Sequence, residues 1–165
     1  MKKTLVLFAT RTGLSYNIAQ RIAEETGAEL AAVSDGRNYS GTLGYLRAAI
    51  AGLKKVPYRN RPLDTEHPLE EYDQIVLAGP IWCEKWCSII RRFLMDYGKS
   101  LHCPVHFVVT HMSDNAYEKP IAMADALLNT PHAELISLKT KIESEDEQAK
   151  HDAEIARFIE AISMP

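Results

Sequence analysis

Cysteine is scarce in this sequence, and its spacing argues against two kinds of site. The chain of 165 residues contains three cysteines, Cys83, Cys87 and Cys103. An odd number of cysteines in a chain long enough to build a core does not indicate a disulfide framework. Cys83 and Cys87 do not form the C-x-x-C of a dithiol oxidoreductase. A zinc site made from the cysteines and His106 also lacks a paired C-x-x-C, so we expect no metal.

The sequence also lacks a long apolar run and a large charge of one sign. The apolar run after Lys2 and Lys3 ends at Arg11, which is too short for a signal peptide or a membrane span. We therefore expect a cytoplasmic protein without a membrane partner. The formal net charge of −3 argues against a uniformly basic nucleic-acid binder. It is also too small for the strongly acidic surface of a general electron carrier.

The charge is unevenly distributed along the chain. Residues 35–61 contain one acid, Asp35, and six cations: Arg37, Arg47, Lys54, Lys55, Arg59 and Arg61. This segment therefore carries a local charge of +5, and the rest of the chain sums to −8. Such a basic segment either steers an anionic partner or forms a solvated helix face with a loop.

Three common catalytic loops are absent as well. The sequence has no G-x-S-x-G, which excludes the nucleophile elbow of a serine hydrolase. The loop after the first apolar run lacks the lysine and spacing of a P-loop. A phosphoacceptor receiver needs an acidic pair after its first strand and an Asp after its third, and here Thr10, Arg11 and Gly79 occupy these places.

Apolar and helical segments alternate along the whole chain. We predict strands over residues 4–9, 28–33, 74–78, 105–110 and 134–138. We predict helices over residues 16–25, 42–55, 87–98 and 120–129, and a last helix that begins in the acidic residues 143–147 and is completed by residues 149–162. The helix over 42–55 carries Leu43, Leu46, Ile50 and Leu53 on one face. This alternation is typical of a single α/β domain over residues 1–165. Its doubly wound five-stranded parallel sheet has the order 2-1-3-4-5, with helices on both faces.

In such a sheet the ligand lies at the carboxyl ends of strands one, three and four, so three loops should meet there. The first loop offers the hydroxyls of Thr10, Thr12 and Ser15 just before a predicted helix. Amides, hydroxyls and the positive end of a helix dipole together can hold a phosphate, although a capped helix start has the same composition.

The second and third loops carry aromatic and polar side chains. Trp82 follows the third strand directly and suits stacking against a planar ring, whereas we expect Trp86 to pack under the following helix. In the third loop His111 could tune a bound group through its charge near neutral pH, or it is an ordinary surface histidine.

Taken together, three segments resemble the flavodoxin family. Residues 8–15, FATRTGLS, are similar to the FMN phosphate loop, commonly T/S-x-T-G-x-T/S. Residues 40–48, SGTLGYLRA, resemble a segment of bacterial and archaeal flavodoxin-like proteins. Residues 72–82, YDQIVLAGPIW, resemble the third strand and first isoalloxazine loop. The similarity continues through residues 92–94 and the last helix, and it implies a flavodoxin-like fold with noncovalent FMN.

The resemblance also implies cofactor-binding residues. The hydroxyls of Thr10, Thr12 and Ser15 would hold the phosphate, with the amides of Arg11, Gly13 and Leu14. One side of the isoalloxazine would be lined by Pro80, Ile81, Trp82 and Cys83, next to Glu84. The other side would be lined by Thr110, His111, Met112, Ser113, Asp114 and Asn115.

Three departures from the family pattern affect these residues. Leu14 replaces a usual Asn near the phosphate, and the third loop lacks the usual glycines. Glu84 stands where Gly often occurs near flavin N5. Its Cβ should resist a positive φ, and its carboxylate adds a negative charge.

Three functions are compatible with these features. The first is an FMN electron carrier for a dedicated redox partner protein. The second is an FMN oxidoreductase acting on a small acceptor such as a quinone, with Trp86, His111 and Tyr117 shaping the substrate pocket. The third is a binding protein that keeps the fold and has lost FMN.

Overall fold

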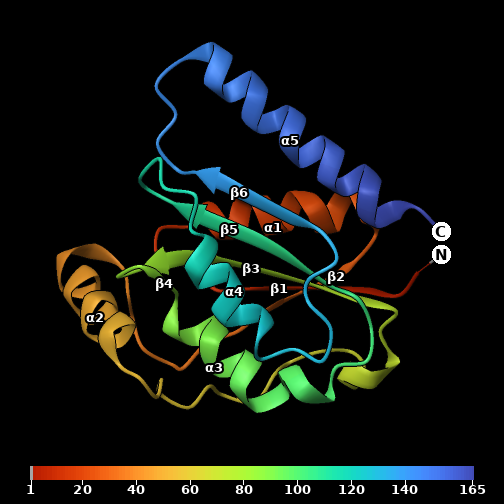
Figure 1. Ribbon diagram of the computed structural model, residues 1–165, viewed down its shortest axis with the longest axis horizontal. Coiled ribbons are helices and arrows are strands. Elements are labelled where there is room, and N and C mark those ends of the chain that lie inside the picture. Colours follow the sequence, from red (N-terminus) through yellow and green to blue (C-terminus); the bar gives the residue numbers. More distant parts are fainter. Residues whose placement is uncertain (1) are drawn as a thin grey trace.

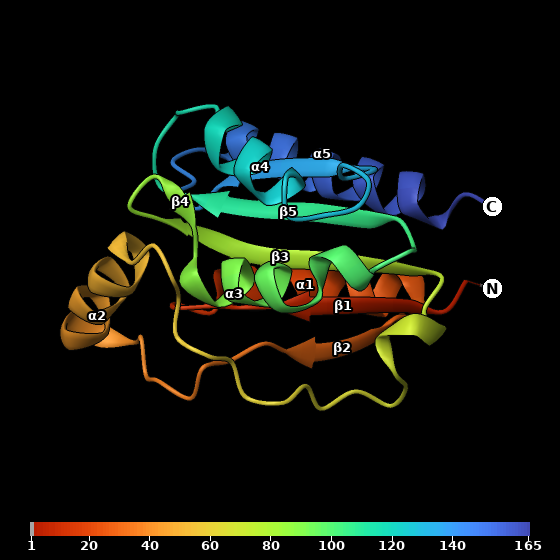
Figure 2. The same cartoon turned by 60° about the horizontal axis from the view of Figure 1, so that its bottom comes forward.

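The centre of the molecule is a sheet of parallel strands. The computed structural model describes residues 2–165. The strand order is β2-β1-β3-β5-β6, which Figure 2 shows from one edge of the sheet to the other. The bounds are β1 Thr4–Phe8, β2 Glu29–Ala32, β3 Gln74–Trp82, β5 Val105–His111 and β6 Leu135–Lys139. Because β5 and β6 are the fourth and fifth expected strands, the predicted order 2-1-3-4-5 is confirmed.

Helices cover both faces of the sheet, as predicted. Their bounds are α1 Leu14–Thr26, α2 Gly41–Leu53, α3 Ser88–Tyr97, α4 Glu118–Asp125 and α5 Glu145–Ser163, with short 3-10 turns η1 Leu69–Glu71 and η2 Gly98–Ser100. Helices α1 and α5 lie on one face and α3 and α4 on the other (Figure 2). Nowhere in the described part of the chain is a helix both long and apolar enough to span a bilayer.

The third strand is longer than the sequence predicts. It continues beyond Ala78 to Trp82 and then turns back into β4, Lys85–Trp86, which pairs antiparallel with it. The two turn residues, Cys83 and Glu84, have φ values of 49° and 57°. Positive φ at both central residues is the type I′ arrangement of a two-residue hairpin. The hairpin therefore holds Glu84 at positive φ in spite of the resistance expected from its Cβ.

Helix α2 packs with its small residues inward. Gly44, Ala48, Ala51 and Gly52 are buried. A Cβ built on Gly44 would lie 2.1 Å from the carbonyl carbon of Tyr39, so the turn that leads into α2 leaves no room for a side chain at position 44. The four large apolar residues on the opposite face are instead exposed to solvent: Leu43 69%, Leu46 57%, Ile50 51% and Leu53 67%.

A buried arginine ties α2 to the rest of the molecule. Arg91 of α3 donates hydrogen bonds to the carbonyls of Trp86 at 2.9 Å, Lys54 at 3.1 Å and Gly52 at 3.2 Å. Burial lowers the pKa of this guanidinium from its usual value. Because carbonyls at a helix C-terminus carry partial negative charge and lack partners within the helix, Arg91 caps α2 and fixes it beside the β3–β4 hairpin.

Candidate functional site

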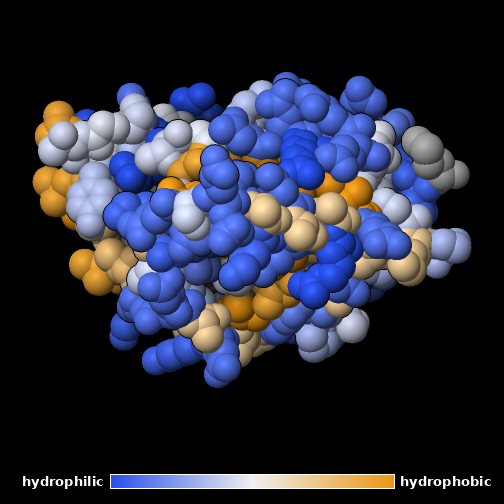
Figure 3. Space-filling model, turned by 90° about the horizontal axis from the view of Figure 1, so that it is seen from above, coloured by the Kyte–Doolittle hydropathy of each residue, from blue (hydrophilic) through white to orange (hydrophobic). Residues whose placement is uncertain are grey.

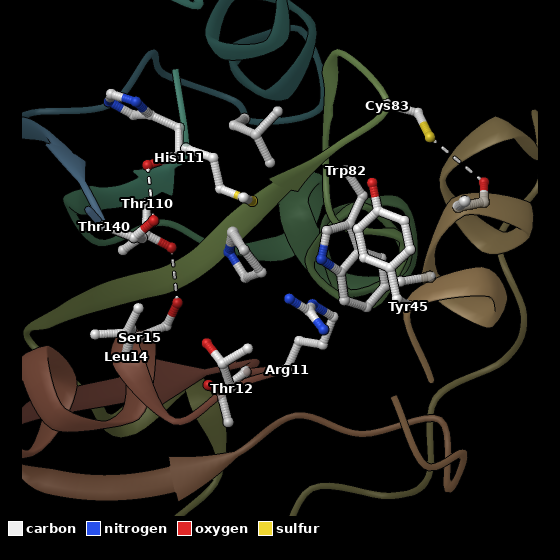
Figure 4. A pocket seen from close by; sticks show the side chains of 16 residues that line it. Arg11, Thr12, Leu14, Ser15, Tyr45, Trp82, Cys83, Thr110, His111 and Thr140 are labelled. Atoms are coloured by element: carbon white, nitrogen blue, oxygen red, sulfur yellow. Dashed lines mark hydrogen bonds between the residues drawn. The ribbon is translucent and has the colours of Figure 1, made fainter. Parts of the chain in front are cut away.

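A pocket of about 350 Å³ opens at the carboxyl ends of β1, β3 and β5. This is the end of the molecule that carries α2, opposite the two chain termini (Figure 1). Figure 4 shows the 16 residues that line it: Thr10, Arg11, Thr12, Leu14, Ser15, Tyr45, Ala48, Ala49, Pro80, Ile81, Trp82, Cys83, Thr110, His111, Met112 and Thr140. The volume lies within the roughly 300–1,000 Å³ of small-molecule sites.

One wall of the pocket is the beginning of α1. Gly13 precedes this helix with φ 92°, a conformation that favours glycine. Within residues 2–165 no side chain caps the helix start. Helix geometry leaves the amides of Leu14, Ser15 and Tyr16 without partners inside the helix. These amides and the helix dipole make the position suitable for an anion.

Hydroxyl groups surround the same helix start. The Oγ1 of Thr10 accepts a hydrogen bond from the Gly13 amide at 2.9 Å, so its own O–H is free to donate. Ser15 and Thr110 share a hydrogen bond of 2.9 Å between their hydroxyl oxygens. One of these two hydroxyls donates in that bond, and the other has a hydrogen for a ligand. The first and third loops therefore meet, as the sequence predicts.

The opposite wall of the pocket is aromatic. Trp82 is 7% exposed, and its ring lies 4.8 Å from that of Tyr39, centroid to centroid. Its buried Nε1 has no hydrogen-bond partner in the part of the chain that the structure describes. Tyr45 of α2 also lines the pocket (Figure 4), and the guanidinium carbon of Arg11 lies 5.4 Å from the Tyr45 ring centroid.

Trp86 has a different environment from Trp82. It is 2% exposed, donates from Nε1 to the Gly79 carbonyl at 2.9 Å, and contacts Phe107 edge-on with ring centroids 4.7 Å apart. The prediction that Trp86 packs in the interior is confirmed. It is not a pocket residue, so its expected role in shaping a substrate pocket is wrong.

The third loop is only partly at the pocket. Thr110, His111 and Met112 line it. His111 donates from Nδ1 to the Ser113 carbonyl at 2.6 Å, which leaves Nε2 for a ligand or water. Tyr117 is absent from the pocket lining; its hydroxyl lies 2.6 Å from that of Ser113, and its ring packs on His111.

Five expected binding residues lie outside the pocket lining: Gly13, Glu84, Ser113, Asp114 and Asn115. The Gly13 amide is used by Thr10. The carboxylate of Asp114 pairs with Lys139 at 3.0 Å. Glu84 sits in the hairpin turn, where two successive residues of positive φ hold it beyond the pocket edge.

Four lining residues were not predicted: Tyr45, Ala48, Ala49 and Thr140. Tyr45, Ala48 and Ala49 lie within one helical turn on α2, so their i, i+3, i+4 spacing over residues 45–49 was the available signal. Thr140 donates from its amide to the His111 carbonyl at 2.7 Å. It reaches the pocket through pairing of β6 with β5, which the local sequence does not reveal.

The pocket is electrostatically suited to an anion and contains no reactive thiol pair. Among its lining residues, all of them within the described chain, Arg11 is the one residue with a permanent charge. Burial raises the pKa of the nearby Cys87 thiol to about 12, so it stays protonated. Residues 2–165 contain no group of three or more His, Cys, Asp or Glu side chains placed to hold a metal.

Comparison with solved structures shows where this architecture recurs. A flavoprotein from Lactobacillus acidophilus NCFM, crystallised in complex with FMN, is 20% identical and has a TM-score of 0.69, covering 96% of this chain and 99% of that one. A putative flavoprotein from Bacteroides eggerthii is 17% identical with a TM-score of 0.72 over 100% of both chains. A flavodoxin, WrbA-like protein from Agrobacterium tumefaciens is 11% identical with a TM-score of 0.52, covering 98% and 97%.

No protein-family model and no curated protein sequence matches this chain. The strand order and the structural similarity over the whole chain nevertheless agree. The protein has a flavodoxin-like fold, as the sequence resemblance implied.

Proposed function

We propose that this protein binds one FMN in the pocket at the carboxyl ends of β1, β3 and β5 and transfers electrons for a dedicated redox partner. The observation that carries this proposal is the uncapped start of α1, among residues 2–165, beside three hydroxyls and one arginine. A structure of similar fold was crystallised with FMN. Bound FMN supplies one- or two-electron chemistry, and the protein supplies binding and orientation.

The α1 end of the pocket suits the FMN phosphate. The amides of Leu14 and Ser15 and the hydroxyls of Thr10 and Thr12 can donate hydrogen bonds to phosphate oxygens. Leu14 provides an amide here, so the side-chain amide usual at this position is not required. No carboxylate in the described pocket lining opposes an anion.

The aromatic end suits the isoalloxazine. Trp82 and Tyr45 offer ring surface, and Pro80 and Ile81 offer apolar contact on the same side. The buried, unpartnered Nε1 of Trp82 is a donor that a flavin carbonyl or ring nitrogen would satisfy. On the other side Thr110 and His111 provide polar contacts.

An electron carrier fits this site better than a self-contained enzyme. Three lining residues of the described chain can serve as general acid or base, namely His111, Tyr45 and Cys83, and the Nδ1 of His111 is already committed to the Ser113 carbonyl. The described lining holds no carboxylate or lysine that could position or protonate a small substrate. The availability of His111 Nε2 keeps an FMN oxidoreductase with a small acceptor as the second candidate.

The test is a titration of the purified, flavin-free protein with FMN and with riboflavin, followed by flavin fluorescence. We expect tight binding of FMN and much weaker binding of riboflavin, because riboflavin lacks the phosphate. Equal binding of both flavins would contradict the phosphate site. A colourless protein that ignores FMN indicates a binding protein without flavin, and steady turnover of NAD(P)H with a quinone indicates the oxidoreductase.

A further inference from the structure

The outer face of α2 is an apolar surface that the fold leaves uncovered. Four side chains form it, here called the α2 ridge: Leu43, Leu46, Ile50 and Leu53, each more than half exposed. Helix α2 stands at one end of the molecule, apart from the sheet (Figures 1 and 2). In Figure 3 hydrophobic surface gathers at this same left-hand end.

The ridge has no role in packing α2 onto the protein. Gly44, Ala48, Ala51 and Gly52 make that contact, and Arg91 secures the helix end. Large apolar side chains that are grouped on the surface and take no part in core packing mark interaction sites. The ridge also borders the pocket, because Tyr45, Ala48 and Ala49 of the same helix line it.

A basic hollow of about 370 Å³ lies along one flank of the ridge. Its lining residues are Arg37, Asn38, Arg47, Ile50 and Tyr58. The guanidinium of Arg37 stacks 3.6 Å from the Tyr58 ring centroid, and the Lys54 ammonium lies 4.7 Å from it. These contacts hold two cations in place, and Arg37 also forms an ion pair with Asp35 at 3.8 Å.

Little negative charge is available nearby to neutralise this hollow. Asp35 is the one acid in residues 35–61, and its side chain is 2% exposed and accepts a hydrogen bond from the Tyr39 hydroxyl at 2.6 Å. Within the described chain neither Arg47 nor Lys54 forms an ion pair. The hollow therefore favours a ligand group that brings its own carboxylate.

The shape and charge of this surface select one kind of occupant. A second copy of this chain on the ridge would bring the basic flanks together if the two-fold axis ran across α2. If the axis ran along α2, each basic flank would face the pocket edge of the other copy, where the described lining residues include no carboxylate. A lipid surface favours cations on both flanks of an interfacial helix. Here the other flank is the pocket edge, with Tyr45, Ala49 and a single cation, Arg11, which lines the pocket 5.4 Å from the Tyr45 ring centroid. A protein can place acidic side chains along one edge of an apolar groove, and so it fits both features.

We infer that the α2 ridge and its basic hollow form the docking surface for an acidic redox protein. This partner inserts the ridge into an apolar groove and places Asp or Glu side chains in the hollow. The inference rests on the proposed function for its redox character, since docking at α2 brings the partner next to the pocket. The docking surface itself does not require bound FMN.

The probe is an acidic plant-type [2Fe–2S] ferredoxin. Backbone amide shifts of the isotope-labelled protein are recorded during titration with oxidised ferredoxin at low salt, with and without FMN. We expect shifts confined to α2 and the residues around the hollow. Leu46→Gln and Ile50→Gln should each weaken binding about tenfold. Arg47→Glu should weaken it similarly at low salt and less at high salt, because screening reduces charge pairing.

Two control variants test whether the loss of ferredoxin affinity is specific to the α2 ridge and its hollow. Met123→Gln removes an exposed apolar side chain from α4, and Lys150→Glu reverses an exposed charge on α5. Both should leave ferredoxin affinity unchanged. The circular dichroism spectrum and the unfolding midpoint of every variant show whether it is folded.

Several outcomes would overturn the inference. The first is an absence of ferredoxin binding, and the second is ferredoxin binding that the ridge variants leave unchanged. The third is a dimer of this chain that Ile50→Gln dissociates, and the fourth is selective binding of phosphatidylserine vesicles through the ridge. If the protein bound ferredoxin at α2 but did not bind FMN, the result would contradict the proposed function and leave the docking surface intact. Stopped-flow reduction of the FMN form by reduced ferredoxin then tests whether docking leads to electron transfer.

Discussion

Helices α5 and α2 use the same apolar periodicity in opposite ways. Helix α5 buries Ile155, Phe158, Ile159 and Ile162 against the sheet. Helix α2 buries glycine and alanine and exposes leucine and isoleucine. The first arrangement places apolar area where it stabilises the fold. The arrangement of α2 lacks that stabilisation, but it lets the helix pack closely, form a wall of the pocket and present an apolar outer face. The difference separates a structural helix from one that serves a binding site.

The largest expected effect compares core and ridge directly. Phe158→Ala should lower the free energy of unfolding by about 3–5 kcal/mol, because it leaves a cavity beneath α5. Leu46→Ala should change it by about 0.5 kcal/mol or less, since Leu46 is exposed. Urea unfolding followed by circular dichroism measures both. A large loss in Leu46→Ala would mean that the ridge packs against part of the fold.

Acid should destabilise the α5 side selectively. His106 is 4% exposed, its ring lies against Phe158 with centroids 6.2 Å apart, and burial lowers its pKa from about 6.5 to about 4. A pKa lower in the folded state means that stability is complete above about pH 6.5 and is lost as the pH falls toward 4.

The expected loss between about pH 7 and pH 5 is roughly 2 kcal/mol, at 1.36 kcal/mol for each pH unit below the unfolded-state pKa. Urea midpoints of the wild type and His106→Asn at both pH values isolate this contribution. The His106→Asn protein should lose less stability on acidification. The same loss in both proteins would assign the acid sensitivity to other groups.

The starts of α1 and α5 extend the comparison to the pocket. The α5 start is capped by Ser144, whose Oγ accepts from the Glu147 amide at 3.2 Å, whereas the described residues provide no such cap for α1. Thr12→Val should therefore weaken FMN binding by about 1.5–3 kcal/mol with little change in stability, since it removes a donor to a charged group.

Ser144→Ala should do the reverse, costing about 1 kcal/mol of stability and leaving FMN affinity unchanged. FMN titration and urea unfolding give the FMN affinity and the free energy of unfolding of each variant. Unchanged FMN affinity in Thr12→Val would show that the Thr12 hydroxyl does not contact the FMN phosphate.

The smallest expected effect concerns the close approach of α2. Gly44→Ala favours helix formation by about 1 kcal/mol, but its Cβ would clash with the Tyr39 backbone at a cost of about 1–3 kcal/mol. We expect a net loss of about 1 kcal/mol and weaker FMN binding, because Tyr45 moves with the helix. Thr42→Ala, at an exposed position of α2, is the control and should do neither. A stabilised Gly44→Ala protein would show that the turn between Tyr39 and α2 can shift to accept a Cβ.

Local sequence was sufficient for the strand–helix alternation and the sheet order. Continuous apolar runs such as Ile75–Val76–Leu77 fit only strands covered on both faces, and such strands joined by helices have few arrangements. The same reasoning placed Thr10, Ser15 and Thr110 at one edge, because parallel strands end together. Their hydroxyls do meet there.

Other features were decided by tertiary contacts. The β3–β4 hairpin holds Glu84 at positive φ against its own preference, since pairing of Trp82 with Lys85 fixes the turn. Tyr45 and Thr140 reach the pocket through packing of α2 and pairing of β6, which connect segments far apart in the chain.

The sequence by itself therefore determined the fold class, the sheet order and the edge where a ligand can bind, because apolar periodicity and strand direction are local properties of the chain. The tertiary structure alone decided that α2 turns its leucines outward. A periodic pattern defines two helix faces, and only the face with Gly52 fits against β3, where a Cβ built on Gly52 would lie 3.1 Å from the Cβ of Trp82.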